Sequence, residues 1–199
     1  MEGKNGIWAI VLAAGEARRM QAPKMVLPFG ELTIIETVIR SASVPGIDGI
    51  VVVTGGWEKE VVDVIGKEDL LLCTNKNYRA GMFSSVQAGV AVLPGHATAF
   101  MILHGDMPMV GRGIVNKLTD AFLLSGKGIA LPVNNGKRGH PVIIGAHYKN
   151  EILGMDISDS LRTFMENHSA EILEVECDPE ILRDIDTRED YIEELKLKS

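Results

Sequence analysis

Residues 7–32 read IWAIVLAAGEARRMQAPKMVLPFGEL, and this stretch decides the fold class. Its apolar opening, Ile7 to Leu12, is typical of a short strand that is buried on both faces. About twenty residues, Ala13 to Leu32, then pass before a helix begins, and a structureless connection of this length is usually functional. The opening of the chain therefore predicts a buried strand with a ligand-binding loop at its carboxyl end.

Strand-like and helix-like segments alternate along the next hundred residues. The capping box Thr33 to Glu36, for example, marks the start of the first helix. We expect strands over 7–12, 49–54, 70–73 and 99–103, and helices over 34–42, 57–65, 82–93 and 114–124. This rhythm predicts an α/β fold with a doubly wound, mostly parallel sheet and helices on both faces, as in Rossmann-like proteins.

The pattern changes after the fourth predicted helix. Strands over 129–133 and 141–144 flank a Gly-rich turn and predict a small β subregion. A helix over 158–167, a strand over 170–176 and a last helix after the Thr187 cap follow. Because no linker or repeat interrupts the chain, we expect one domain over residues 1–199.

Composition limits the class of protein and its partners. The chain has 199 residues, of which 46% are hydrophobic and 24% charged, as in soluble globular proteins. Its net charge of −7, without a basic stripe, disfavours a nucleic-acid partner. No apolar run approaches the roughly 20 residues that span a bilayer, so we expect no membrane partner. Two cysteines without CxxC spacing favour a reducing, cytoplasmic location.

The loop after the first strand carries residues suited to phosphate groups. Ala13, Ala14 and Gly15 are small enough to let backbone N–H groups approach a ligand. Arg18, Arg19 and Lys24 then supply positive charge. Such a loop fits a nucleoside triphosphate, although a surface loop with incidental basic residues is the plain alternative. The sequence lacks a Walker A motif, and no GxGxxG follows the first strand, so a P-loop NTPase and a standard dinucleotide-binding protein both fit poorly.

A lone carboxylate follows the strand predicted over 99–103. Asp106 lies in the segment His104 to Pro108, at the carboxyl end of a central strand, where open parallel sheets bind their ligands. A carboxylate at this place suits Mg²⁺, which binds one or two carboxylates together with substrate phosphates. The alternative is a turn or capping residue. The histidines at positions 96, 104, 147 and 168 lack metal-ligand spacing, so His96, His104, His147 and His168 are interpreted as structural or solvated.

At these positions the sequence resembles the MobA-like nucleotidyltransferase family. The family signature LAAGxSxRMGxxK matches Leu12 to Lys24, with Ala17 in place of Ser and Gln21 in place of Gly. The match continues in order through 53–55, 75–85, 105–108, 138–141 and 184–187, and so covers nearly the whole chain. The Ala-Ala-Gly start and the Arg-Gly-His-Pro segment resemble the cytidylyl branch, the molybdenum cofactor cytidylyltransferases. The guanylyl branch usually has Leu-Ala-Gly-Gly and lacks Gly-His-Pro.

The resemblance implies a reaction and a set of partners. CMP would pass from CTP to the phosphate of molybdopterin or of the molybdenum cofactor, with Mg²⁺ as cofactor and pyrophosphate as the second product. The recipient of the dinucleotide cofactor would be a molybdenum hydroxylase. Residues up to about 110 would bind the nucleotide, and residues from about 111 to 199 the acceptor. The alternatives are a nucleotidyltransferase that uses GTP or a sugar or polyol phosphate, and a non-catalytic protein that delivers the cofactor.

The resemblance also implies roles for individual residues. Catalytic roles fall to Arg19, Lys24 and Asp106, and Mg²⁺ binding to Asp106 and Asp186, although Asp186 could equally cap a helix. The nucleotide-binding set is Leu12, Ala13, Ala14, Gly15, Arg19, Lys24, Thr54, Asn75, Gly81, Ser84 and Ser85. The acceptor-binding set is Arg138, Gly139 and His140. Two of these have an equally fair structural interpretation, Ser84 as a helix-start residue and His140 as a structural histidine.

Base choice gives a first prediction. Ala14 stands where the guanylyl branch carries Gly, and its methyl group would occupy room that a purine needs. Ala14→Gly should therefore admit some GTP, with a shift of roughly 10- to 200-fold at most in the ratio of kcat/KM for CTP and GTP. Steady-state kinetics with both nucleotides measure the ratio. An unchanged ratio would mean that residue 14 does not face the base.

Overall fold

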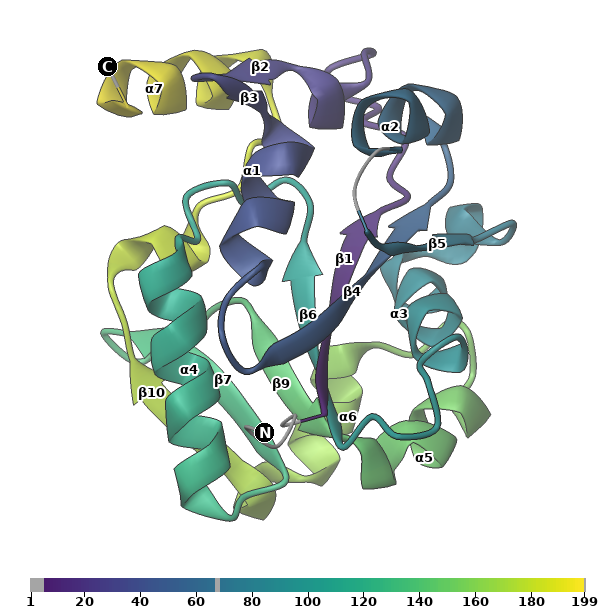
Figure 1. Ribbon diagram of the computed structural model, residues 1–199, viewed down its shortest axis with the longest axis vertical. Helices are drawn as coiled ribbons and strands as arrows, with labels where there is room; N and C mark the ends of the chain where they lie inside the picture. The colour runs from purple at the N-terminus through teal and green to yellow at the C-terminus, as the bar shows by residue number, and fades with distance from the viewer. Residues whose placement is uncertain (1–5, 67–68, 199) are drawn as a thin grey trace.

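The computed structural model describes residues 6–66 and 69–198, which form a central sheet between two layers of helices (Figure 1). The strands of the sheet are β1 (Ile7–Ala13), β4 (Ile47–Thr54), β5 (Leu71–Thr74), β6 (Ala99–His104), β7 (Ile129–Asn134), β8 (Lys137–Arg138), β9 (Val142–Gly145) and β10 (Ile172–Glu176). They lie in the order β10-β7-β9-β6-β1-β4-β5, with β8 beside β7. β1 is central and runs parallel to both β4 and β6.

The alternation of side chains along β1 explains how it supports two layers. Ile7, Ala9 and Val11 pack into one hydrophobic cluster, whereas Ile10 and Leu12 pack into another on the opposite face. A strand buried on both faces has to be apolar at nearly every position, which is the pattern that the sequence showed. The predicted fold class, a mostly parallel sheet with helices on both faces, is confirmed.

The two helical layers separate cleanly. One face of the sheet is covered by α1 (Ile34–Ala42), α2 (Glu58–Ile65) and α4 (Arg112–Ser125), and the other by α3 (Met82–Ala91), α5 (Lys149–Gly154) and α6 (Leu161–Asn167). Short 3₁₀ turns are η1 (Lys24–Val26), η2 (Tyr78–Ala80), η3 (Ala146–Tyr148), η4 (Ser169–Glu171) and η5 (Pro179–Leu182). The predicted capping box of α1 is present: the Thr33 N–H donates to Glu36 Oε2 at 2.8 Å, and the Glu36 N–H donates to Thr33 Oγ1.

The sequence suggested a structureless connection after β1, but the connection contains regular structure. It contains η1 and the hairpin of β2 (Pro28–Phe29) and β3 (Leu32–Thr33). The helix α7 (Arg188–Lys198) lies alongside this hairpin (Figure 1), and Tyr191 donates its hydroxyl to the Pro28 carbonyl at 2.6 Å. Phe29, Ile34 and Ile185 form a small core between them. The end of the chain is thereby anchored beside its first loop.

Other details differ from the sequence-based expectation in the second half. The strands expected in a small β subregion join the main sheet instead, where β9 runs antiparallel between β6 and β7. α5 was not predicted, because six residues are too few to show a helical period. Within residues 6–66 and 69–198, no helix has the length and apolar character needed to cross a membrane.

A glycine sets how closely α3 approaches the sheet. A Cβ on Gly89 would lie 2.5 Å from Ile10 Cγ2 and 3.0 Å from Val53 Cγ2, which is inside the normal contact distance. Gly113 on α4 is a matched control, because a Cβ there meets nothing within 4 Å. Both substitutions replace a glycine within a helix by alanine, and the main difference between the two positions is the packing around the new methyl group.

The substitutions Gly89→Ala and Gly113→Ala therefore test this packing. Gly89→Ala should have a free energy of unfolding that is about 1–3 kcal/mol lower than that of Gly113→Ala, because the extra methyl group overpacks the core. Urea denaturation measures both values. Equal stability of the two variants would contradict the close contact between α3 and β1.

Candidate active site

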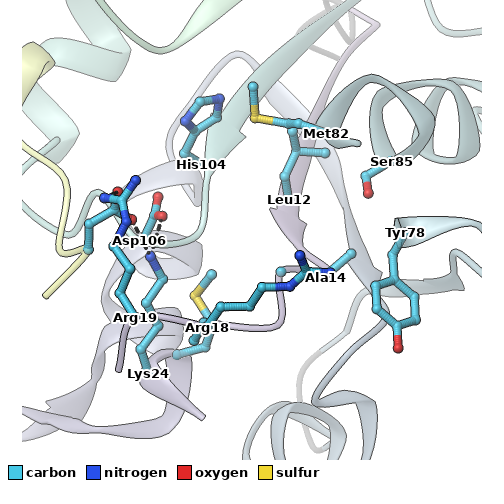
Figure 2. Close-up of a pocket in the computed structure, with 14 residues that line it drawn as sticks. Leu12, Ala14, Arg18, Arg19, Lys24, Tyr78, Met82, Ser85, His104 and Asp106 are labelled. Atoms are coloured by element: carbon cyan, nitrogen blue, oxygen red, sulfur yellow. Dashed lines mark hydrogen bonds and ion pairs between the residues drawn. The ribbon is translucent and has the colours of Figure 1, made fainter. Parts of the chain in front are cut away.

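A cavity of about 410 Å³ opens at the carboxyl ends of β1 and β6 (Figure 2). Its lining comes from the end of β1 and the loop after it, from η2 and the start of α3, from the end of β6 and the loop after it, and from the segment before α7. These residues are Leu12, Ala14, Gly15, Ala17, Arg18, Arg19, Lys24, Met25, Tyr78, Met82, Ser85, His104, Asp106 and Asp186. Open α/β sheets bind ligands at this edge.

Lys24 is the centre of the charged end of the cavity. Its side chain is only 8% exposed, and its Nζ donates to Asp106 Oδ2 at 2.7 Å and to Asp186 Oδ1 at 2.9 Å. A third bond, of 2.8 Å, goes to the carbonyl oxygen of Ile185. All three donors of the ammonium group are thus satisfied by oxygen atoms.

The charges around Lys24 stabilise one another. Burial opposes the positive charge of Lys24, but attraction to Asp106 and Asp186 outweighs it and raises the pKa of the lysine above its usual range. The hydrogen bond from Lys24 lowers the pKa of Asp186. Arg19 adds a second cation, with Nη1 2.7 Å from Asp186 Oδ2. The lysine and Asp186 therefore both stay charged at neutral pH.

Backbone contacts bring Asp106 and Asp186 together. The Gly105 N–H donates to the Leu12 carbonyl at 2.9 Å, and a Cβ on Gly105 would lie 2.8 Å from that oxygen. The Ile185 N–H donates to the Asp106 carbonyl at 2.9 Å. Glycine at position 105 lets the loop after β6 lie directly on the end of β1, and this places Asp106 next to Asp186.

The start of α7 leaves the side chain of Asp186 free for the cavity. The carboxylate of Asp190 accepts from the N–H groups of Asp186 and Thr187, at 3.1 and 2.7 Å, and Thr187 Oγ1 accepts from the Asp190 N–H. The helix is therefore capped by Thr187 and Asp190. Asp186 instead holds two cations, so its side chain belongs to the cavity and not to the cap.

The opposite end of the cavity is lined by Ala14, Tyr78 and Ser85 (Figure 2). Behind it lies Asn75, which is 5% exposed and whose Nδ2 donates to Ser84 Oγ at 2.8 Å and to Ser85 Oγ at 2.9 Å. Because Ser85 Oγ accepts this hydrogen bond, its own proton is available to a ligand in the cavity. Asn75 thus orients a cavity residue without lining the cavity itself.

The structure brings many of the predicted site residues together and leaves others behind them. Leu12, Ala14, Gly15, Arg19, Lys24, Ser85, Asp106 and Asp186 line the cavity. Ala13, Thr54, Asn75, Gly81 and Ser84 do not line it. Ala13, for example, packs into the core on the other face of the sheet. Ser84 Oγ donates at 2.7 Å to the carbonyl oxygen of Gly81, the N-cap residue of α3.

The three residues of the predicted acceptor-binding segment lie in three different environments. Arg138 is exposed and pairs with Glu174 at 2.8 Å. Gly139 lies against the backbone of Ile181, with no room for a Cβ. His140 alone turns inward, and its ring stacks on His104 with centroids 3.8 Å apart.

His104 lines the cavity although the sequence analysis set it aside as structural or solvated. Burial lowers the pKa of His104 to about 4, with the charge of Lys24 adding to the effect, and burial lowers the pKa of His140 to about 3. Both rings are uncharged at neutral pH. The alternation of side chains along β6 could have predicted the position of His104. Phe100 and Ile102 face the same layer, and residue 104 continues their series beyond the core.

Glu16 is a second residue that sequence analysis missed. Its carboxylate accepts from Arg18 Nε at 2.7 Å and from Arg79 Nε at 3.0 Å, and these hydrogen bonds lower its pKa. Trp57 also donates its Nε1–H to the Glu16 carbonyl at 2.8 Å. Glu16 thereby joins the first loop to η2 at the rim of the cavity, a contact across 63 positions of sequence that local patterns do not show.

Comparison with known proteins agrees with this geometry. Residues 9–172 match the family model of the MobA-like NTP transferase domain. The molybdenum cofactor cytidylyltransferase of Escherichia coli K12 is 30% identical over 190 residues, which cover 94% of this chain and 95% of that protein.

Two solved structures share the fold. A nucleotidyl transferase from Methanothermobacter has a TM-score of 0.82 at 22% identity, covering 97% of this chain and 99% of the other. Rv0371c from Mycobacterium tuberculosis H37Rv, in complex with manganese, has a TM-score of 0.73 at 23% identity, covering 96% and 98%. These two structures show the fold, whereas the family match and the E. coli relative confirm the predicted resemblance. The chain belongs to the MobA-like NTP transferase family and is a nucleotidyltransferase.

Proposed function

We propose that this nucleotidyltransferase moves CMP from CTP to the terminal phosphate of molybdopterin or of the molybdenum cofactor. The similarity to the E. coli cytidylyltransferase along 94% of the chain supports the choice of substrates. The observation that carries the chemistry is the buried ammonium of Lys24 between two carboxyl groups, at one end of a cavity whose wall begins with Ala14 and Gly15.

The reaction requires positioning and charge neutralisation more than proton transfer. An oxygen of the acceptor phosphate forms a bond to the α-phosphorus of CTP. The bond from this phosphorus to the oxygen that bridges to the β-phosphate breaks, and pyrophosphate leaves with the electron pair. The attacking phosphate is already an anion, so no strong general base is needed. Lys24 and Arg19 stabilise the charge that grows on the pyrophosphate.

Two carboxyl groups fit a divalent cation that arrives with the nucleotide. In the described part of the chain, no cluster of three or more His, Cys, Asp or Glu residues is arranged to hold a metal ion. Mg²⁺ commonly binds one or two carboxylates and completes its shell with phosphates and water. Asp106 and Asp186 would hold it there, and the cation would neutralise charge on the phosphates. The manganese complex of the mycobacterial structure supports a divalent cation.

Lys24 affects when a divalent cation can bind to the two carboxyl groups. The lysine already balances the carboxyl groups of Asp106 and Asp186, with Nζ within 2.9 Å of both. A cation without a triphosphate would therefore compete with an ammonium group for the same oxygens. A triphosphate offers Lys24 new partners, so we expect the cation and the nucleotide to bind together.

The two substrates would bind to different parts of the chain. We assign nucleotide binding mainly to residues up to about 110 and acceptor binding mainly to residues from about 111, where the Arg138 to Pro141 segment brings His140 against His104 of the cavity. The product would be passed to a molybdenum hydroxylase.

The proposed location is the cytoplasm. Both cysteines, Cys73 and Cys177, are free, which suits a reducing compartment.

A substrate panel tests the proposed function. Purified protein is incubated with CTP, GTP, ATP or UTP and Mg²⁺, each with molybdenum cofactor or with sugar and polyol phosphates, and pyrophosphate release is measured. We expect release only with CTP and the molybdenum cofactor. Release with GTP, or with a sugar or polyol phosphate, would replace the proposed substrates. Tight binding of the cofactor without any release would indicate a delivery protein.

Lys24 provides the matching mutational test. Lys24→Ala should lower kcat by about 10²–10³, because the variant loses the charge that stabilises departing pyrophosphate. Lys59→Ala on the exposed face of α2 is the control for loss of a lysine and should behave like wild type. Thermal melting establishes that Lys24→Ala is folded. A change confined to the KM of the acceptor would assign Lys24 to the acceptor and not to the triphosphate.

A further inference from the structure

His104 lies at the reacting end of the cavity and has no role in the function proposed so far. It is the last residue of β6 and pairs in register with Leu12 of β1. In Figure 2 its ring stands on the side of the cavity that holds Asp106, away from Tyr78 and Ser85. The charges of Lys24 and Asp186 are close enough to act on it. His104 therefore borders the space beside the phosphate-binding groups and not the end that would hold the base.

His140 fixes the ring of His104 from behind. The two rings are 3.8 Å apart between centroids, with an angle of 33° between their planes. His140 is itself held by its backbone, whose N–H donates to the Ile181 carbonyl at 3.1 Å. The neighbouring Gly139 N–H donates to the Pro132 carbonyl at 2.9 Å. The stack is therefore built from the end of β6 and the distant segment between β8 and β9, and it limits how far the ring of His104 can turn.

The pair contains polar atoms that the protein does not satisfy. Nε2 of His104 and Nδ1 of His140 are buried, and neither has a hydrogen-bond partner among residues 6–66 and 69–198. Buried polar atoms in folded proteins are nearly always paired, so an orphaned nitrogen on each of two stacked rings needs an explanation. A purely structural stack at this position would be better served by two apolar rings. Because Nε2 of His104 has almost no accessible surface, the nitrogen that a polar ligand in the cavity can reach is Nδ1, to which the described residues offer no hydrogen bond.

We propose that His104 is an acceptor-binding residue, which donates an imidazole N–H to the attacking phosphate, and that His140 is a positioning residue that holds its ring. This inference rests on the proposed function. The attacking oxygen has to lie beside the groups that bind the α-phosphate, and His104 borders that space. His104 gives up no proton in the reaction: it only orients the oxygen that bonds to the α-phosphorus while pyrophosphate leaves.

Substitution of His104 tests the hydrogen bond. His104→Phe keeps a flat ring for the stack but has no donor, whereas His104→Gln and His104→Asn each retain an N–H at a different reach. We expect His104→Phe to raise the KM of the acceptor by about 10- to 100-fold, the usual effect of losing a hydrogen bond to a charged group. The KM of CTP should stay close to wild type. At least one of the two amide variants should recover part of the loss.

Substitution of His140 tests the positioning role separately. His140→Phe preserves a stacking surface, and His140→Ala removes it. His140→Ala should therefore raise the KM of the acceptor more than His140→Phe does, again with little change in the KM of CTP. His147→Phe, at an exposed histidine of η3, is the control for exchanging an imidazole for a phenyl ring. Thermal melting of every variant establishes that it is folded.

The assays use whichever phosphate acceptor supports pyrophosphate release by the wild-type protein. Equal acceptor KM values for wild type and His104→Phe would overturn the inference, as would equal losses for the acceptor and for CTP. In either case the wild-type activity would leave the proposed nucleotidyl transfer standing. A wild-type protein that is inert with every acceptor would overturn the proposed function and the inference with it.

Discussion

The buried ammonium of Lys24 is the interaction on which the rest of the site depends. It joins the loop after β1 to Asp106, 82 residues away, and to Asp186, 162 residues away. A charge that is this deeply buried is tolerated only when it is paired and hydrogen-bonded, so these segments cannot separate without a large cost. In the proposed reaction, the same group also supplies the positive charge that stabilises the departing pyrophosphate. The positive charge of Lys24 would therefore serve both to hold the three segments together and to assist the proposed reaction.

The sheet makes this convergence possible. β1 and β6 are parallel neighbours, so the loops that follow them leave from the same edge. The third segment reaches that edge because α7 packs against the β2–β3 hairpin through Phe29 and Ile185. Glycine at position 105 then allows the closest approach between the first two loops. The charged groups of the cavity thus come from segments that backbone hydrogen bonds and packing hold together at one edge of the sheet.

Sequence patterns predicted those parts of the molecule that depend on local physics. Apolar runs identified β1 and β6, the Thr33–Glu36 box began α1, and loop chemistry selected Lys24 and Asp106. The contacts of Lys24 with Asp186 could not be predicted locally, since they cross most of the chain. The same reason hid the stack of His104 on His140 and the bond of Glu16 to Arg79. Asn75 illustrates the reverse case, because a residue within a matching segment can support the cavity from behind without lining it.

The central role of Lys24 is tested most directly by measuring metal binding with and without a nucleotide. Binding of Mn²⁺ to the protein is followed by electron paramagnetic resonance, alone and with a CTP analogue that resists cleavage between its α- and β-phosphates. Because Lys24 already balances Asp106 and Asp186, we expect weak Mn²⁺ binding to the protein alone and much tighter binding with the analogue present. Equally tight binding of Mn²⁺ without the analogue would contradict the role of Lys24 as the partner of both carboxyl groups.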